Sequence, residues 1–453
     1  MVSFENDMSL VRALPLIGGF LLLTLTGLHA QVPQGAPQPV PGAASSSSPV
    51  TLTLADALNR AKANSAQFQA ALTQFGLAKE DQLQARAAML PNIQYTNAFI
   101  YTQGNGVTGR FVANNGVHEY ISQGIFHEAI SFGSLPDYQR TVASKALAEA
   151  RAEIASRGLV VTVVQLFYGL LAAQEKTLNV ERATYEAQHF LELSKKLEAG
   201  GEVAHSDVVK AQIQANDASR QLQDTKLAEQ NARLSLAVLI FPNFFQDFVL
   251  INDLASLSAV PDRASVEQSA KDNNPELQAA FAALRAANKE VTVARAGHLP
   301  SLTVDFFYGI DANQFATEDR NGLRNLGYSG AASLNIPIFS WGATQSKVKQ
   351  AELQRRQAQV ELSAAQRQAL ADFQSFYAEA QTSFGEINTL RSSADLAADN
   401  LRLTNLRYQA GEATALEVVD AQNTLTQARN ALQDGEVRYH LALANLQTLT
   451  GQF

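Results

Sequence analysis

The chain has 453 residues, a formal net charge of −8 and no cysteine in its sequence. The acidic balance argues against a nucleic-acid-binding protein, whose footprint would be basic. The cysteine count excludes disulfides, thiolate metal sites, a cysteine nucleophile and a lipid-modified N-terminal cysteine, so no lipid anchor is expected. The seven histidines show no ligand spacing, and the sequence predicts neither a metal site nor a cofactor.

The sequence of the N-terminal region predicts an export signal followed by a linker. Residues 13–30 form an apolar run that ends in Leu-His-Ala, which predicts a secretory signal over residues 1–30, cleaved after Ala30. A membrane anchor is the alternative interpretation of the same run. Residues 31–50 are rich in Pro, Gly and Ser, which is typical of a disordered linker.

A first series of elements follows the linker. Apolar residues recur at helical spacing from 53 to 89, and Pro91 ends that helix. Residues 92–103 alternate as a strand does, and a second strand is expected near 111–126. The next helix, from 137 to 197, contains no proline and spans about 90 Å if continuous.

The glycine pair Gly200-Gly201 ends the long helix. A further helix is expected from 206 to 238, followed by an irregular segment, 242–263, that joins the two halves of the chain.

The same order then returns. A helix over 264–297 ends at Pro300, and strands are expected at 301–310 and 327–336. Apolar residues lie on one face of each of these strands. A second long helix is expected over 343–409, and Gly411 breaks it. A last helix is expected over 414–449.

The two series are related in sequence. Residues 201–241 align without gaps over 411–451 with 13 identities, and 55–93 align over 264–302 with 13 more. The common offset of about 210 residues predicts a tandem duplication, with repeats at 52–241 and 264–451.

The strands and helices together predict a membrane α+β architecture. Strands of about 9–11 residues with one apolar face fit a transmembrane β-barrel. Four strands per chain cannot close, because about eight is the smallest barrel that closes around side chains. Three chains would supply twelve strands, and the long helices would continue the barrel as a coiled-coil tunnel.

The repeated unit resembles the TolC family of outer-membrane efflux proteins. The most specific segment is Tyr408-Gln-Ala-Gly411-Glu-Ala-Thr-Ala-Leu-Glu417-Val-Val-Asp420-Ala-Gln. The resemblance implies a homotrimer in outer-membrane lipid that reaches through the periplasm. It also implies a passive exit duct that docks onto a periplasmic adaptor and an inner-membrane pump, without enzymatic activity. The alternative is a soluble periplasmic coiled-coil scaffold or adaptor.

Two acidic residues are the candidates for a periplasmic gate. Glu417 and Asp420 lie at i, i+3, on one face of a helix just past the glycine turn. A solvated helix face is the plain interpretation. By resemblance these positions match acidic residues around the family's periplasmic constriction, where like charges raise one another's pKa and attract cations. The first copy has Asp207 and Lys210 instead.

The resemblance also suggests residues that link the two helical hairpins near this level: Ser206, Asp207 and Tyr408. The family's linking arginine falls at Ala413, so that link is absent or replaced. Arg407 is a nearby substitute, although an exposed helix arginine is the simpler interpretation.

Three glycines are expected to take positive φ at helix ends and, by resemblance, to form adaptor-facing tips: Gly200, Gly201 and Gly411. Several strand aromatics suit lipid-facing or interfacial positions, or ordinary packing: Phe99, Tyr101, Phe306, Tyr308 and Tyr328.

Overall fold

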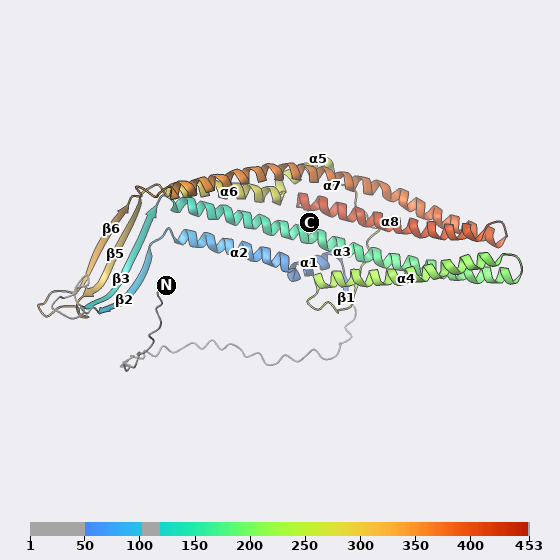
Figure 1. Cartoon of the computed structure of the whole chain (residues 1–453), viewed down its shortest axis with the longest axis horizontal. Helices are drawn as coiled ribbons and strands as arrows, with labels where there is room; N and C mark the ends of the chain where they lie inside the picture. The colour runs from blue at the N-terminus through green and yellow to red at the C-terminus, as the bar shows by residue number, and fades with distance from the viewer. Residues whose placement is uncertain (1–49, 102–117, 452–453) are drawn as a thin grey trace, which may run out of the picture. The chain divides into compact units, whose positions relative to one another are not determined.

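A computed structural model describes residues 50–101 and 118–451 of the chain. The predicted signal and all of the predicted linker except Val50 lie outside the described residues. Those from Val50 onward belong to one compact unit, whose elements are drawn in Figure 1.

The elements fall into two series along the chain. The first series consists of β1 (Val50–Leu52), α1 (Leu54–Asn64), α2 (Ala66–Ala87), β2 (Asn92–Tyr101), β3 (His118–Ser131), α3 (Ser134–Ala199) and α4 (His205–Ile240). The second series consists of β4 (Phe248–Leu250), α5 (Arg263–Asn273), α6 (Pro275–Ala296), β5 (Ser301–Ala312), β6 (Leu326–Asn335), α7 (Ala343–Gln409) and α8 (Ala415–Thr450).

Two helices that the sequence predicts as continuous are broken in the structure. Ser65 ends α1 and caps α2, because its side chain accepts a hydrogen bond from the amide of Phe68 at 3.3 Å. Asn274 caps α6 in the same way, and Pro275 occupies the first helical position. Both breaks are local capping features, which helical periodicity alone does not reveal.

The four longer strands form one antiparallel sheet in the order β2-β3-β5-β6. The second strand, β3, ends later than the predicted 126, and the first part of the predicted range 111–126 lies outside the described residues. Among the described strands, β2 and β6 each have a neighbour on one side only.

The register gives the sheet two chemically different faces. Residues paired directly across strands lie on the same face, so the paired positions Ile93, Phe126 and Phe306 share one face. That face carries most of the large apolar residues: Ile93, Tyr95, Phe99, Tyr101, Tyr120, Phe126, Ile130, Leu302, Val304, Phe306, Tyr308, Ile310, Leu326, Tyr328 and Leu334. The other face carries most of the polar ones, including Gln94, Thr96, Gln123, His127, Thr303, Asp305, Ser329, Ser333 and Asn335.

The helices form a layer that starts at the sheet. From the sheet to the middle of this unit, α3 contacts α2 and α6, and α6 contacts α7. Beyond the middle, α4 and α8 take over, so that α3 contacts α4 and α8, and α8 contacts α7 (Figure 1). The two longest helices, α3 and α7, run through both parts, and their 66 and 67 residues correspond to about 100 Å each.

The largest core lies at the middle of α3, where α3 packs against α1, α4 and the two short strands. β1 and β4 pair in parallel, with Leu52 opposite Leu250. The sequence predicts a disordered linker through Val50 and an irregular segment through the residues of β4. Both were wrong, because a three-residue strand depends on a partner about 200 residues away.

One helix in the described part of the chain, α3, is long and apolar enough to cross a membrane by length and composition. Its apolar stretch includes Val163, Phe167 and Leu170, which have no exposed surface and belong to the central core. The burial accounts for this apolar stretch without a membrane.

Candidate functional site

The two turns at the far end of the helices have the same backbone geometry. After α3, the Gly201 amide donates to the Glu198 carbonyl and the Glu202 amide to the Leu197 carbonyl, both at 2.9 Å. After α7, the Gly411 and Glu412 amides repeat this pattern at 3.1 and 2.8 Å. These paired bonds are those of the Schellman motif, which requires a left-handed residue just past the helix.

Only one glycine in each turn takes that conformation. Gly201 and Gly411 both have φ of 75°, while Gly200 has φ of −79° and ends α3 as a right-handed residue. The prediction of positive φ was therefore wrong for Gly200, because the Schellman motif needs a single left-handed position.

The helices that leave the two turns begin differently. At the start of α8, the Thr414 hydroxyl accepts from the Glu417 amide at 3.3 Å, and the Glu417 carboxylate accepts from the Thr414 amide at 3.3 Å. This reciprocal pair is a capping box. The matching cap of α4 is Ala204, which offers no side-chain acceptor.

Glu417 has a second partner across the turn. Arg407, near the end of α7, lies 3.5 Å from the Glu417 carboxylate and also donates to the Glu412 carbonyl at 3.1 Å. These contacts stay within the α7–α8 turn. Arg407 therefore stabilises this turn. The described structure shows no bond from Arg407 to the other hairpin, which consists of α3 and α4. Ala413 packs against the apolar core at the tip.

Asp420 is exposed one turn further along α8. Within the described residues its carboxylate makes no ion pair, whereas in the first copy Asp207 pairs with Lys210 at 3.3 Å. The second tip thus presents an unpaired carboxylate at the position where the first presents a lysine.

Tyr408 connects the two hairpins inside one chain. Its side chain is 3 % exposed, its hydroxyl lies 3.1 Å from the Ser194 hydroxyl of α3, and its ring packs 5.0 Å from the ring of Phe190. Ser206 is exposed and Asp207 bonds its own helix, so in the described structure Tyr408 bonds neither of them.

Ser194 and Phe190 were not predicted as partners of Tyr408. Their i, i+4 spacing on α3 places both on one helix face. The sequence can show that the two residues share a face. It cannot show that this face contacts Tyr408 of α7, which lies 214 residues after Ser194.

Small side chains make further contacts between the two hairpins, α3–α4 and α7–α8. Ala211 and Ala215 of α4 and Ala421 of α8 are buried together in the tip core. Beside them, Gln214 of α4 donates to Asn423 of α8 at 3.1 Å. Alanines allow close helix approach, so the four tip helices pack as a bundle.

The pKa of Glu186, on α3 near this bundle, is raised. Burial is the main cause, and it is opposed by the charges of Arg429 on α8 and Arg182 on α3. A carboxylate of the first hairpin and an arginine of the second thus interact close to the tip.

The two helix–strand junctions are built around prolines. Pro91 lies between the end of α2 and the start of β2, and Pro300 lies immediately before β5. Proline lacks the amide that would continue a helix, which suits both positions.

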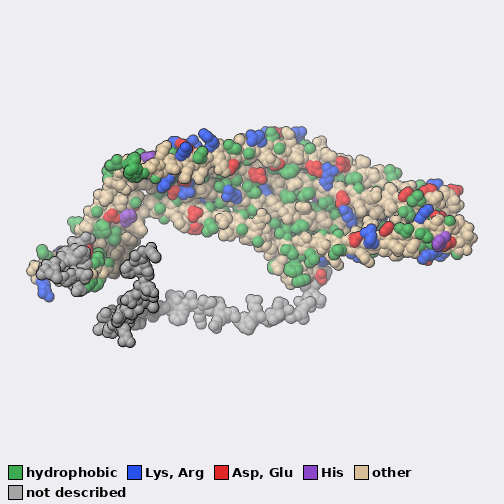
Figure 2. Space-filling model, viewed as in Figure 1, with side chains coloured by type: hydrophobic (Ala, Val, Ile, Leu, Met, Phe, Trp, Pro, Cys, Tyr) green, Lys and Arg blue, Asp and Glu red, His purple; other side chains and the backbone are tan. Residues whose placement is uncertain are grey.

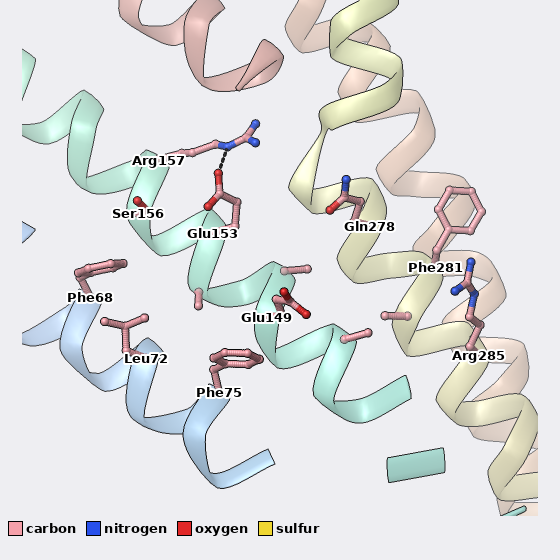
Figure 3. A pocket seen from close by; sticks show the side chains of 14 residues that line it. Phe68, Leu72, Phe75, Glu149, Glu153, Ser156, Arg157, Gln278, Phe281 and Arg285 are labelled. Atoms are coloured by element: carbon pink, nitrogen blue, oxygen red, sulfur yellow. Dashed lines mark hydrogen bonds and ion pairs between the residues drawn. The ribbon is translucent and has the colours of Figure 1, made fainter. Parts of the chain in front are cut away.

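A groove of about 730 Å³ lies between α2, α3 and α6. Figure 3 shows Phe68 and Phe75 projecting from α2 and Phe281 from α6, with the Glu153–Arg157 ion pair of 2.7 Å on α3 between them. Arg157 also donates to the Thr448 carbonyl of α8 at 2.6 Å. Arg157 therefore links α3 to α8 at this groove.

Comparison with known proteins matches the chain to one family. A family model described as "Outer membrane efflux protein" matches residues 266–452. The proteases secretion protein PrtF of Dickeya chrysanthemi is 25 % identical over 416 residues, covering 88 % of each chain. The outer membrane protein TolC of Vibrio cholerae is 26 % identical over 408 residues, covering 88 % of this chain and 90 % of its own. Residues 266–452 thus match the outer membrane efflux protein family, and the chain as a whole is similar to TolC-like outer-membrane proteins.

Solved structures of outer-membrane channels show the same fold as this chain. The CmeC outer membrane channel of Campylobacter jejuni gives a TM-score of 0.78 at 17 % identity, over 88 % of this chain and 85 % of its own. The outer membrane protein VceC of Vibrio cholerae gives 0.76 at 19 %, over 88 % and 96 %. The likeness shows a channel-type fold with an α-helical tunnel.

Similarity to outer membrane efflux proteins places this protein in the outer membrane, with an extension into the periplasm. Its relatives are channels rather than enzymes. This location disagrees with the soluble periplasmic scaffold considered as the alternative from the sequence.

Proposed function

We propose that three copies of this chain form an exit duct that passively conducts substrates from a periplasmic adaptor and an inner-membrane pump to the exterior. The observation that carries the proposal is the sheet β2-β3-β5-β6, which has an apolar face, a polar face and two open edges. A sheet of this kind is one part of a barrel wall, with lipid on one side and water on the other.

The open edges support closure by further copies. In hydrocarbon every backbone group needs an internal partner, so β2 and β6 cannot remain edges in a membrane. Pairing β6 of one copy with β2 of the next gives twelve strands for three copies, an even number within the range of outer-membrane barrels.

The outer helices support the same closure. Ile213, Leu227 and Leu234 are exposed along α4 at multiples of seven residues, and Leu396 and Leu403 are exposed along α7 at a spacing of seven. Heptad spacing is that of a coiled-coil seam. We infer that α4 of one copy packs against α7 of the next and continues the barrel as a tunnel.

The repeat boundaries 52–241 and 264–451, joined by 242–263, are proposed as the products of a tandem duplication. The support is the correspondence of the helices in length: 22 residues in both α2 and α6, 66 and 67 in α3 and α7, and 36 in both α4 and α8. The two Schellman turns correspond as well.

The two tips, at Gly201 and Gly411, are proposed as the contact with the adaptor. They lie at the end of the helices farthest from the sheet (Figure 1), which is the end that would reach into the periplasm. Relatives include a proteases secretion protein, a pyoverdine export protein and a cobalt-zinc-cadmium resistance protein. These relatives support a duct that belongs to either an efflux system or a type I secretion system.

Glu417 and Asp420 are proposed as the gate. Asp420 is exposed and unpaired in the described chain, so three copies would bring three such carboxylates to one ring. Glu417 contributes charge and also fixes the start of α8 through the capping box. The bond between Tyr408 and Ser194 is proposed as the link that keeps the hairpins together, while Ser206 and Asp207 remain linking candidates toward a neighbouring copy.

Membrane fractionation and planar-bilayer recording test the proposal. We expect the protein in the outer-membrane fraction as a trimer that resists mild SDS, and we expect purified trimers to form cation-selective channels. Release of the protein without detergent, as expected of a scaffold, or trimers that never conduct would contradict the duct.

A further inference from the structure

The segment 251–262, which joins β4 to α5, crosses three helices and is held to them by their side chains. From α3, Tyr168 donates to the Asp253 carboxylate at 3.4 Å. From α8, His440 bonds the Leu254 carbonyl at 2.9 Å and Tyr439 bonds the Ser258 carbonyl. The last bond runs from α7, where Tyr377 donates to the Pro261 carbonyl at 3.3 Å. We call this segment, with these bonds, the strap.

His440 lies at the centre of the strap. Its ring stacks on that of Tyr168 with centroids 3.9 Å apart and planes at 13°. Because a carbonyl can only accept, the ring nitrogen Nε2 carries the hydrogen that bonds Leu254. Leu254 is 3 % exposed and packs into the central core, so the strap is anchored on both sides of this bond.

The strap crosses the three helices at similar distances from the tips. Tyr168 lies 31 residues before the end of α3, Tyr377 lies 32 before the end of α7, and His440 lies 25 after the start of α8. These separations correspond to about 40–50 Å of helix. The strap thus divides the helices into a part that supports the sheet and a part that carries the tips.

The charged groups around His440 come from every helix that packs there. Asp253 faces it from the strap, and one oxygen of that carboxylate is buried without a hydrogen bond among the described residues. Glu175 of α3 accepts from Asn252 of the strap at 2.8 Å.

Glu436 lies one turn before His440 on α8. Burial raises the pKa of Glu436, and this is opposed by the nearby Arg391 of α7. Lys176 of α3 pairs with Asp434 of α8 at 2.6 Å.

We propose that the strap fixes the pivot of the tip-bearing hairpins, and that the bond from His440 to the Leu254 carbonyl keeps it closed. The proposal rests on the proposed gate at the tips, since a pivot matters only if the hairpins separate. His440 is a positioning residue that acts through the strap and touches no substrate.

Burial lowers the pKa of His440, while its bond to Leu254 and the charge of Asp253 oppose the shift. The closed strap therefore prefers the neutral ring, and by linkage a proton favours states in which the ring is more exposed. Acidification is expected to open the strap.

The test measures the separation of the two tips directly. The chain has no cysteine, so spin labels at Glu202→Cys and Glu412→Cys report one intrachain distance when labelled chains are diluted into unlabelled trimers. His440→Phe keeps a stacking ring and removes the hydrogen bond, and Tyr439→Phe removes one hydroxyl. His189→Phe, an exposed histidine of α3 outside the strap, is the matched control.

At pH 7.5 we expect His440→Phe and Tyr439→Phe each to raise the separated-tip population at least threefold, and the control to match the wild type. Between pH 7.5 and 5.5 the wild-type population should rise, whereas that of His440→Phe should stay flat. Should His440→Phe fail to form trimers, Tyr439→Phe decides the outcome by the same measurement.

Unchanged tip distances in folded strap variants, together with faster hydrogen exchange in 251–262, would overturn the proposal and leave the strap a purely structural element. Bilayer conductance, recorded in parallel, separates this result from failure of the duct. Tip separation without any conductance supports the strap and contradicts the duct, whereas conductance with unmoved tips removes the strap and keeps the duct.

Discussion

The two tips of this chain share a backbone and differ in chemistry. Gly201 and Gly411 have the same φ and the same pair of closing hydrogen bonds. Only the second tip has a capping box, an arginine that bonds its turn and an unpaired carboxylate on the next helix. A duplicated turn can therefore keep its shape, which glycine and the backbone set, while the charges it presents diverge.

This divergence also separates two roles of acidic residues. Glu417 bonds Thr414 and lies near Arg407, so one of its roles is to stabilise the start of α8. Asp420 has no such partner in the described chain. The corresponding residues of the first tip, Asp207 and Lys210, neutralise one another.

The largest expected effect concerns the charges of the second tip. Glu417→Ala with Asp420→Ala should raise single-channel conductance and weaken divalent-ion block roughly tenfold, since each close charge contributes on the order of 1 kcal/mol or more. Planar-bilayer recording with added divalent cations measures both.

The first tip provides the matched control. Asp207→Ala with Lys210→Ala removes an exposed ion pair and should change block by less than about twofold. Lys210→Asp should strengthen block, because it gives the first tip an acidic pair. Equal effects at both tips would contradict a gate placed in the second copy.

The next effect concerns the shared backbone. Gly411→Ala and Gly201→Ala should each destabilise their tip by about 1–2 kcal/mol, because a Cβ is strained in the left-handed region. Hydrogen exchange of the tip amides measures this as faster exchange. Gly200→Ala, at negative φ, should leave the exchange rate of the tip amides unchanged or lower. Similar losses of stability at all three glycines would contradict the assignment of one left-handed residue per turn.

The caps are expected to matter slightly less. Thr414→Ala should cost about 1 kcal/mol of local stability at the start of α8. Ala204→Thr should stabilise the start of α4 by up to a similar amount, because Asp207 already occupies the third helical position. Amide exchange in the first turn of each helix checks both. No loss in Thr414→Ala and no gain in Ala204→Thr would show that the difference between the tips is not one of capping.

The smallest expected effect is at the link between the hairpins. Tyr408→Phe removes the bond to Ser194 and keeps the ring against Phe190, which should cost about 1 kcal/mol. We expect a modest rise in open probability in bilayers. Tyr185→Phe, an exposed tyrosine on α3, is the control and should behave as the wild type.

Much of the fold follows from local pattern. The long helices α3 and α7 begin and end within three residues of the predicted bounds, because breakers delimit uninterrupted helical periodicity. The alternation of β5 and β6 predicts the apolar face that the register shows. The breaks at Ser65 and Asn274 were missed, since a polar cap inside a helical pattern resembles any exposed polar residue.

The candidate site was predictable only in part. The positions of Gly201, Gly411, Glu417 and Asp420 follow from the alignment of the two copies. The partner of Tyr408 did not, because Ser194 lies on another helix and its distance in sequence carries no signal. The strap bonds to His440 and Tyr439 were missed for the same reason, since their acceptors are backbone carbonyls that any residue supplies.

Local sequence patterns set the order of the long helices and the four longer strands, the two equivalent turns and the acidic difference between them. These depend on period, breakers and local capping, which act over a few residues. The tertiary structure alone decided that β1 pairs with β4, that Tyr408 bonds Ser194, and that the strap crosses three helices. Such contacts join residues about 80 to 210 positions apart, and only the packing of the folded chain selects them.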